Sequence, residues 1–191
     1  MKIVDAFMFY NEVEMLFFRL NELYNIVDYF IIVEATNTHT GKKKELNFKK
    51  YKEKYNLFLN KIIYIIVNDM PNLNDPWVNE NYQRSCINRG IQQLNLNAED
   101  IIIISDCDEI PDVNTLQLIK NQKICINLMV SLEMDMYYYN FNNIHDKKWL
   151  LAKIMNYNIY KTIMDLNICR KKTNNIIKNG GWHLSYFNNI N

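Results

Sequence analysis

Three carboxylates within four positions, directly after an isoleucine run, are the residues of this chain best placed to do chemistry. The run occupies residues 101–104, and the acids are Asp106, Asp108 and Glu109. A run of β-branched residues bounded by polar ones predicts a strand covered on both faces, and open α/β sheets bind ligands at the carboxyl ends of such strands. In an extended chain Asp106 and Asp108 point the same way, roughly 6 to 7 Å apart.

The sequence provides no cation near these acids, because residues 90–119 contain neither lysine nor arginine. Carboxylates that converge without a cation either raise one another's pKa or bind a hard divalent ion, and oxygen ligands favour Mg²⁺, Mn²⁺ or Ca²⁺. We therefore predict a divalent metal site on Asp106 and Asp108. The alternative is a solvated turn in which Pro111 ends the strand and Asp112 caps the next helix.

A second group of polar side chains precedes the isoleucine run. Glu80, Gln83 and Arg84 stand at i, i+3 and i+4 of a predicted helix, so they share one face. The arginine can bind a phosphate through two hydrogen bonds, and the glutamate can act as a base. The alternative is a surface ion pair worth only about 0.3–0.5 kcal/mol. Glu34 ends an earlier predicted strand and is expected at the same sheet edge as Asp106, where the alternative is an exposed, idle carboxylate.

A third group lies near the C-terminus, in the segment Gly180-Gly181-Trp182-His183. Two of the four glycines stand together here, which indicates a backbone that turns sharply or lets a ligand approach closely. His183 is predicted to complete the metal site begun by Asp106 and Asp108, or to bond a phosphate. The alternative is a structural histidine among aromatic core residues.

The segments that must position these residues alternate between strand and helix patterns. Strands are predicted at residues 2–9, 29–34, 61–67, 101–104, 124–132 and 134–141. Helices are predicted at residues 11–24, 47–59, 77–96 and 113–120. This alternation predicts an α/β fold with a mostly parallel central sheet flanked by helices. No linker or internal repeat divides the chain, so one domain over residues 1–191 is expected.

Composition excludes several function classes. The 191 residues are 49% hydrophobic, which is enough for a sizeable core, and the net charge of +1 gives no electrostatic case for nucleic acid. No apolar stretch is long enough to span a membrane and no signal-peptide pattern occurs, so a cytoplasmic protein is expected. The cysteines, at positions 86, 107, 125 and 169, lack the C-x-x-C spacing of zinc clusters and form no disulfide framework.

Several segments spread over nearly the whole chain occur in an order that matches a known family. They are Phe9-Tyr10-Asn11-Glu12, Phe30-Ile31-Ile32-Val33-Glu34, Gly41, Trp77 to Glu80 with Gln83-Arg84, Asp106 to Pro111, and Gly181-Trp182-His183-Leu184-Ser185. In this order they resemble glycosyltransferase family 17. That family includes the β-1,4-mannosyl-glycoprotein 4-β-N-acetylglucosaminyltransferases, which add the bisecting N-acetylglucosamine to N-glycans.

The resemblance implies an inverting, metal-dependent transferase with a GT-A type of nucleotide-sugar fold, which moves N-acetylglucosamine from a UDP-sugar to a glycan hydroxyl. It implies that Asp106 and Asp108 hold Mn²⁺ or Mg²⁺ against the donor's diphosphate, with His183 as a third ligand and Arg84 on the same phosphates. The donor-binding residues expected with Arg84 are Glu34, Gln83, Asp106 and Trp182.

A carboxylate must also take the proton of the attacking acceptor hydroxyl. The candidates are Glu80, Glu109 and Glu34, in that order. The acceptor itself is not carried over from the family, because a bacterial, protist or viral glycan fits as well as an N-glycan. Animal members carry a membrane anchor and disulfides, whereas this chain starts at its first strand and stops soon after Ser185, as a minimal or C-terminally shortened member would.

Two other function classes stay open at this point. A haloacid-dehalogenase-like phosphatase also has Asp-x-Asp after a hydrophobic strand and would use Asp106 as its nucleophile, although that signature usually opens its domain. A glycan-binding relative that has lost turnover is the other alternative.

Overall fold

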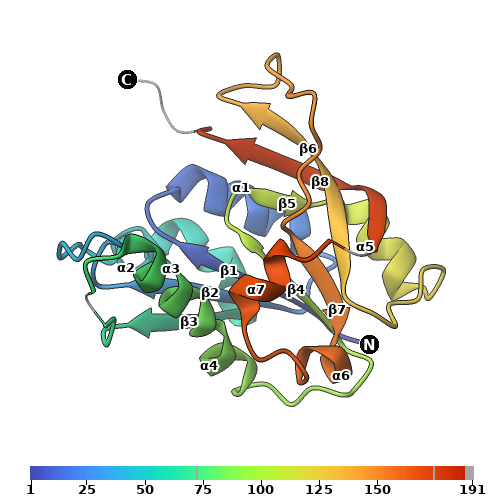
Figure 1. Cartoon of the computed structure of the whole chain (residues 1–191), viewed down its shortest axis with the longest axis horizontal. Helices are drawn as coiled ribbons and strands as arrows, with labels where there is room; N and C mark the ends of the chain where they lie inside the picture. The colour runs from blue at the N-terminus through green and yellow to red at the C-terminus, as the bar shows by residue number, and fades with distance from the viewer. Residues whose placement is uncertain (72, 174, 188–191) are drawn as a thin grey trace.

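The computed structural model describes residues 1–71, 73–173 and 175–187, and within them the strands form one eight-stranded sheet (Figure 1). The strand order is β3-β2-β1-β4-β7-β6-β8-β5. The first half of the sheet is parallel and consists of β1 (Ile3–Phe9), β2 (Tyr29–Ala35), β3 (Ile62–Val67) and β4 (Ile101–Asp106). Its carboxyl edge is therefore where sequence reasoning places a ligand site.

The second half of the sheet is mixed. It consists of β5 (Glu109–Pro111), β6 (Val130–Tyr138), β7 (Lys153–Asn156) and β8 (Ile176–Ser185). β7 runs antiparallel to both β4 and β6, while β8 runs parallel to β6 and antiparallel to β5. Because β5 follows β4 after only two residues, the acid segment connects the parallel half to the strand that carries His183, which pairs with Glu109.

Helices cover both faces of the sheet (Figure 1). One face carries α1 (Val13–Leu23), a 3₁₀ helix (Lys52–Lys61) and α5 (Val113–Lys120). The other carries α3 (Pro76–Ser85), α4 (Ile87–Ile91), α6 (Tyr157–Tyr160) and α7 (Leu166–Lys171), while the short α2 (Asn47–Lys50) follows the loop after β2. No helix within the described part of the chain is long and apolar enough to cross a membrane.

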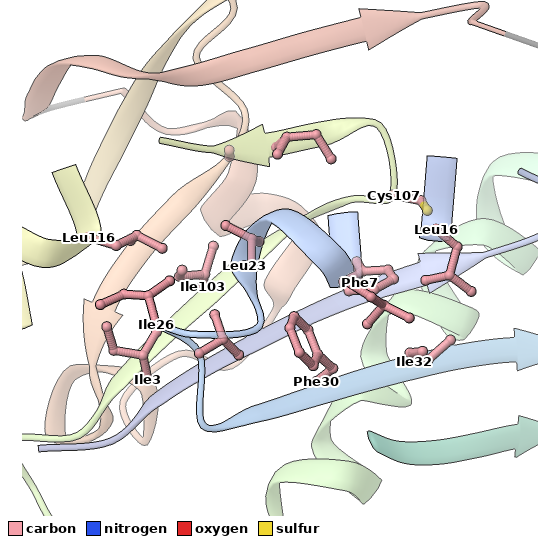
Figure 2. Packing of buried hydrophobic residues seen from close by; sticks show 14 of the residues in the cluster. Ile3, Phe7, Leu16, Leu23, Ile26, Phe30, Ile32, Ile103, Cys107 and Leu116 are labelled. Atoms are coloured by element: carbon pink, nitrogen blue, oxygen red, sulfur yellow. The ribbon is translucent and has the colours of Figure 1, made fainter. Parts of the chain in front are cut away.

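Alternation along the strands divides the core into these two layers. Figure 2 shows the first layer, in which Phe7, Phe30 and Ile103 from the sheet meet Leu16 and Leu23 from α1. The intervening strand residues face the second layer. The predicted α/β class with a helix-flanked sheet is confirmed.

Four of the predicted elements, two helices and two strands, are wrong. The helix predicted at residues 77–96 is broken at Cys86 into α3 and α4, because the chain turns there to lay α4 on β2, where a Cβ at Gly90 would lie 2.5 Å from Ile31. The helix predicted at 47–59 is one turn of α-helix followed by a 3₁₀ helix. The two strands predicted between residues 124 and 141 are the single strand β6, because residues before Val130 make no sheet pairing.

The strand β8 has no counterpart in the sequence prediction. Its central residues, Lys178 to Gly181, are polar or glycine and hide the strand pattern. The glycines do allow a close approach, as expected, but the approaching groups are neighbouring strands. A Cβ at Gly180 would lie 2.7 Å from Leu132, and one at Gly181 would lie 2.0 Å from the carbonyl oxygen of Ile110.

A fully buried arginine on α1 connects that helix to the end of β4. The Arg19 guanidinium donates two hydrogen bonds to the Asp5 carboxylate, at 2.8 and 2.6 Å, and one to the Ser105 hydroxyl at 2.6 Å. It also donates to the backbone carbonyl oxygens of Asp106 (2.7 Å) and Glu109 (2.8 Å). Arg19 thus holds the turn that carries the acids.

We predict that Arg19→Met destabilises the protein by about 3 to 5 kcal/mol, because it leaves the buried Asp5 carboxylate and several carbonyls without a donor. The measurement is the free energy of unfolding in urea. Arg89→Met is the matched control, since Arg89 makes the same two-bond contact with Asp69 but at the surface. The Arg89 side chain is 39% exposed and the Asp69 side chain is 51% exposed. It should cost only about 0 to 1 kcal/mol. Equal losses in the two variants would contradict the role assigned to Arg19.

Candidate functional site

A cavity of about 450 Å³ opens at the carboxyl ends of β1, β2 and β4. Its lining residues follow those three strands or lie on α3, which packs beside them. They include Tyr10 and Glu12 after β1, Asn37 to Thr40 after β2, Glu80, Gln83 and Arg84 on α3, and Asp106 to Asp108 after β4. Open α/β sheets bind ligands in the crevice where the strand order reverses. Here β1 continues to β2 on one side, and the chain returns from β3 to β4 on the other side of β1.

Asp106 does not stand free in the cavity. Its Oδ1 accepts hydrogen bonds from Arg84 at 3.1 Å and from Arg170 at 2.5 Å. Burial by itself raises the pKa of Asp106, but Arg170 and Arg84 outweigh it and hold the pKa well below the usual carboxyl value. The expectation that these acids lack a cation is therefore wrong, because the arginines arrive from α3 and α7.

Glu109 lies beneath the cavity floor and is fully buried. Its carboxylate accepts hydrogen bonds from the backbone N–H of Asp106 (2.9 Å), the indole of Trp149 (2.6 Å) and Arg170 (2.5 Å). Burial raises the pKa of Glu109, against the opposing effect of Arg170. With three donors and no place in the cavity wall, Glu109 anchors the acid turn and has no open oxygen for a reacting group.

Asp108 and His183 are brought together as expected. The Nε2 of His183 lies 3.3 Å from Oδ2 of Asp108, and the Trp149 ring packs on the imidazole with ring centroids 4.3 Å apart. Burial works against the charged imidazole, but the carboxylate of Asp108 outweighs it and raises the pKa of His183. The Nδ1 of His183 is buried without a hydrogen-bond partner. The pair thus favours a positive charge beside it, from a proton or a metal ion.

A divalent cation fits Asp108 and His183 better than it fits Asp106. Carboxylate oxygen and imidazole nitrogen suit Mn²⁺, and Oδ2 of Asp108 and Nε2 of His183 already lie 3.3 Å apart. Asp106 already shares its Oδ1 with two guanidiniums. Nowhere in residues 1–71, 73–173 and 175–187 do three or more His, Cys, Asp or Glu side chains gather as a metal-binding group. A cation here would therefore take further ligands from a bound anion or from water.

The helical group on α3 faces the cavity as predicted. Arg84 donates to Glu80 (2.9 Å) and to Asn167 (2.8 Å), yet its Nε is buried without a partner. An unpaired buried guanidinium N–H is costly, so Arg84 has an unmet hydrogen bond next to the cavity that it lines. Gln83 is held by Val33, whose carbonyl oxygen accepts from its amide at 3.0 Å, and its own oxygen lies 2.9 Å from the ring of His39.

Two further predicted site residues, Glu34 and Trp182, lie away from the cavity. Glu34 points to the opposite face of the sheet, where its carboxylate binds Lys44 (2.6 Å) and the hydroxyl of Tyr64 (2.7 Å), as well as the backbone N–H groups that begin α2. Trp182 packs against the first hydrophobic layer opposite Ile110. Neither forms part of the cavity wall.

Sequence reasoning missed Arg170, Trp149 and Glu12. One signal was present, because only four of the 22 basic residues are arginines. Three of those four, Arg19, Arg84 and Arg170, are buried and hold the acid turn. Where lysine is the usual surface cation, a rare arginine indicates a planar, multiply bonded site.

The predicted alternative for the acid segment is also correct in one respect. Asp112 caps α5, since its side chain accepts a hydrogen bond from the backbone N–H of Thr115 at 2.7 Å. The segment therefore does two things in succession: Asp106 and Asp108 face the cavity, and Asp112 begins the next helix.

Comparisons with known proteins show the family to which the chain is similar. The family model described as "Glycosyltransferase family 17" matches residues 1–191. The β-1,4-mannosyl-glycoprotein 4-β-N-acetylglucosaminyltransferases of Rattus norvegicus and Homo sapiens are each 28% identical over 116 residues, which cover 58% of this chain but only 22% of each relative. The match thus spans about a fifth of the length of those relatives.

A solved structure shares the fold alone. It is 4-diphosphocytidyl-2C-methyl-D-erythritol synthase from Anaerococcus prevotii, which superposes with a TM-score of 0.50 at 10% identity and covers 93% of this chain and 87% of that one.

We predict that Arg170→Met destabilises the protein most strongly near neutral pH. The variant leaves Asp106 and Glu109 without the guanidinium they share, and unpaired buried carboxylates are costly only while they are ionised. Because the folded pKa of Asp106 is depressed, the stability from its ion pairs is present above the ordinary carboxyl pKa of about 4 and is lost as the pH falls below it.

The measurement is the difference in unfolding free energy between wild type and variant, which should shrink from pH 7 toward about pH 3. Lys50→Met, which removes the exposed partner of Glu45, is the control and should show a small difference throughout. A difference for Arg170→Met that does not change with pH would contradict the ion-pair account.

Proposed function

The chain belongs to glycosyltransferase family 17, and on that premise we propose that it is an inverting transferase that moves a sugar from a UDP-sugar to a glycan hydroxyl. N-acetylglucosamine is the proposed sugar, after the name of the family's N-acetylglucosaminyltransferases. One observation carries the proposal. The cavity at the carboxyl ends of the strands is lined by Arg84 next to Asp106 and Asp108, and Asp108 is paired with His183. A guanidinium beside a carboxylate–imidazole pair is suited to a diphosphate.

Arg84 is the proposed phosphate ligand from the protein. Its two terminal nitrogens are already oriented by Glu80, Asn167 and Asp106, so the guanidinium is fixed before a donor arrives. One N–H on Nη1 and the N–H on Nε have no acceptor among these bonds, and the Nε is buried, so a donor oxygen would reach the Nε only after a local shift. A positioned charge of this kind stabilises the negative charge that builds on the leaving UDP, and it costs no reorganisation during the reaction.

Asp108 and His183 are the proposed residues for Mn²⁺ or Mg²⁺. A divalent ion bound there would act as a Lewis acid on the leaving diphosphate. Asp106 was expected to be a metal ligand, but in this proposal its carboxylate orients Arg84 and Arg170 instead. Trp149 holds the imidazole of His183 from behind.

The nucleoside end of the donor is proposed to lie along the loop after β2. His39, Thr38 and Thr40 line the same cavity as Arg84. Gln83 contributes indirectly, since its amide fixes the ring of His39 at 2.9 Å. Glu34 and Trp182 are left out of this proposed site, because both side chains are engaged elsewhere.

The phosphatase alternative lacks support from the site. A nucleophilic aspartate is weakened by cations that stabilise its negative charge, and the carboxylate of Asp106 accepts hydrogen bonds from two arginines. The family match also favours a transferase.

We predict that the protein with Mn²⁺ releases UDP from UDP-N-acetylglucosamine or another UDP-sugar, and that Asp108→Asn lowers the rate about 100-fold or more. The asparagine keeps the shape of the side chain but removes its charge, so the loss reports on the cation. UDP release is measured with and without Mn²⁺ and with water as the acceptor. Asp135→Asn, at the exposed ion pair with Lys148, is the control and should match wild type.

The proposal fails if no UDP-sugar binds and phosphate esters are turned over instead. Donor binding without release, in both wild type and variant, would identify a glycan-binding relative that has lost turnover.

A further inference from the structure

A second cavity, of about 360 Å³, adjoins the proposed donor site. It is lined by Glu12 and Asp108 together with residues at the end of β8, among them Ser185, Tyr186 and Phe187. Glu12 and Asp108 also line the first cavity. These two carboxylates therefore stand between the two hollows and are accessible from both.

The carboxylate of Glu12 is held by backbone donors. Its Oε2 accepts hydrogen bonds from the backbone N–H groups of Tyr10 and Asn11, both at 3.0 Å. The backbone N–H of Glu12 also bonds its own carboxylate, and no side-chain donor contacts Oε1 among the residues described. Burial raises the pKa of Glu12, against the opposing effect of those backbone bonds. A carboxylate that is fixed by backbone donors and lines both cavities suits a general base.

Tyr186, which lines the second cavity, belongs to a group of three stacked tyrosines. Tyr186 follows β8 and stacks on Tyr138 and Tyr139 at the end of β6. Its ring centroid lies 6.2 Å from that of Tyr138 and 5.6 Å from that of Tyr139, with interplanar angles of 20° and 22°. Tyr139 and Tyr186 are 55% and 64% exposed. Parallel rings presented to solvent beside a cavity offer the flat apolar faces on which the C–H face of a pyranose ring packs.

The backbone at both tyrosines is strained. Tyr139 has φ of 64° and Tyr186 has φ of 58°, in the left-handed region that bulky residues rarely adopt. The two strand ends are also tied together, since the N–H of Tyr139 donates to the carbonyl oxygen of Ser185 at 3.0 Å. Glycine would adopt this conformation without strain, so tyrosine at both positions indicates that the rings have a use.

We propose that the second cavity binds the acceptor sugar, with a pyranose ring on Tyr186 and its neighbours, and that Glu12 takes the proton of the attacking hydroxyl. This inference rests on the proposed transferase function and names the acceptor side of that site. The acceptor is thus a pyranose glycan rather than a protein side chain, because the stacked rings match a flat sugar face.

The reaction balances with these groups alone. The acceptor oxygen forms a bond to the anomeric carbon, the bond from that carbon to the diphosphate oxygen breaks, and UDP leaves with the electron pair. The hydroxyl proton passes to the carboxylate of Glu12. Glu80 is less suited to this step, because it lines only the first cavity and its Oε1 is bonded to Arg84 on the leaving-group side.

The first test is Glu12→Gln. The amide oxygen can still accept from Tyr10 and Asn11, so the fold and the affinity for UDP-sugar with Mn²⁺, measured by calorimetry, should stay within about twofold, whereas UDP release should fall about 100-fold or more. Azide attacks without giving up a proton, so it should restore turnover in this variant by about tenfold or more and yield a glycosyl azide. Asp108→Asn, by contrast, should gain nothing from azide.

Wild-type turnover in Glu12→Gln, loss of donor affinity, or no rescue by azide would each overturn the assignment of the base. Absence of UDP release from the wild type with every UDP-sugar would instead refute the proposed function on which it rests.

The second test addresses the tyrosines. The probes are the methyl pyranosides of mannose, glucose, galactose and N-acetylglucosamine, each added to protein with UDP and Mn²⁺ and observed by saturation-transfer NMR. At least one should give a signal on its ring C–H protons, and Tyr186→Gly should abolish it. Gln122→Gly is the matched control, because it relieves a similar strain (φ of 57°) at the end of α5 and should leave the signal unchanged. No signal for any probe, or an equal signal in Tyr186→Gly, would overturn the acceptor site.

Discussion

The buried guanidinium of Arg19 is the interaction on which the rest of the site depends. A chain that leaves β4 and enters β5 after two residues exposes its carbonyl oxygens to the protein interior, where unpaired polar groups are costly. Arg19 donates to three of them and is itself neutralised by Asp5, while its plane packs on Phe7 at 4.2 Å. The turn can therefore be sharp and still satisfied, and its side chains are free to face the cavity.

Strand alternation then divides the work between the two faces of the sheet. Ser105 faces α1 and meets Arg19, whereas Asp106 faces the opposite layer and meets Arg84 and Arg170. The carboxyl end of β4 is therefore contacted by Arg19 from one face of the sheet and by Arg84 and Arg170 from the other. Because every guanidinium there is oriented by a carboxylate or amide, the positive charge is positioned in advance of any ligand, which is the condition for electrostatic catalysis.

The same turn separates two cavities that share Glu12 and Asp108. An inverting displacement needs the leaving group and the attacking oxygen on opposite sides of one carbon. The proposed donor cavity, lined by Arg84, and the proposed acceptor cavity, lined by Tyr186, would meet that need with different side chains. The tyrosines of the proposed acceptor cavity come from the mixed half of the sheet, because they stand at the ends of the paired strands β6 and β8.

The sequence by itself determined the parallel strands, the helix cap at Asp112 and the edge at which Arg84, Asp106 and Asp108 meet, because these follow from local patterns and short spacings. The tertiary structure alone decided which partners these residues have. Arg170 lies 64 positions from Asp106, so no local pattern predicts that contact. The strand β8 was not predicted, because its glycines, which allow close contacts with β5 and β6, hide the strand pattern. Glu34 and Glu109, both candidate bases by type, were assigned to structural networks by burial. The periodicity of the sequence determines which face of a helix or strand a residue occupies. Only the packing of distant segments determines which charged side chains are left without a partner.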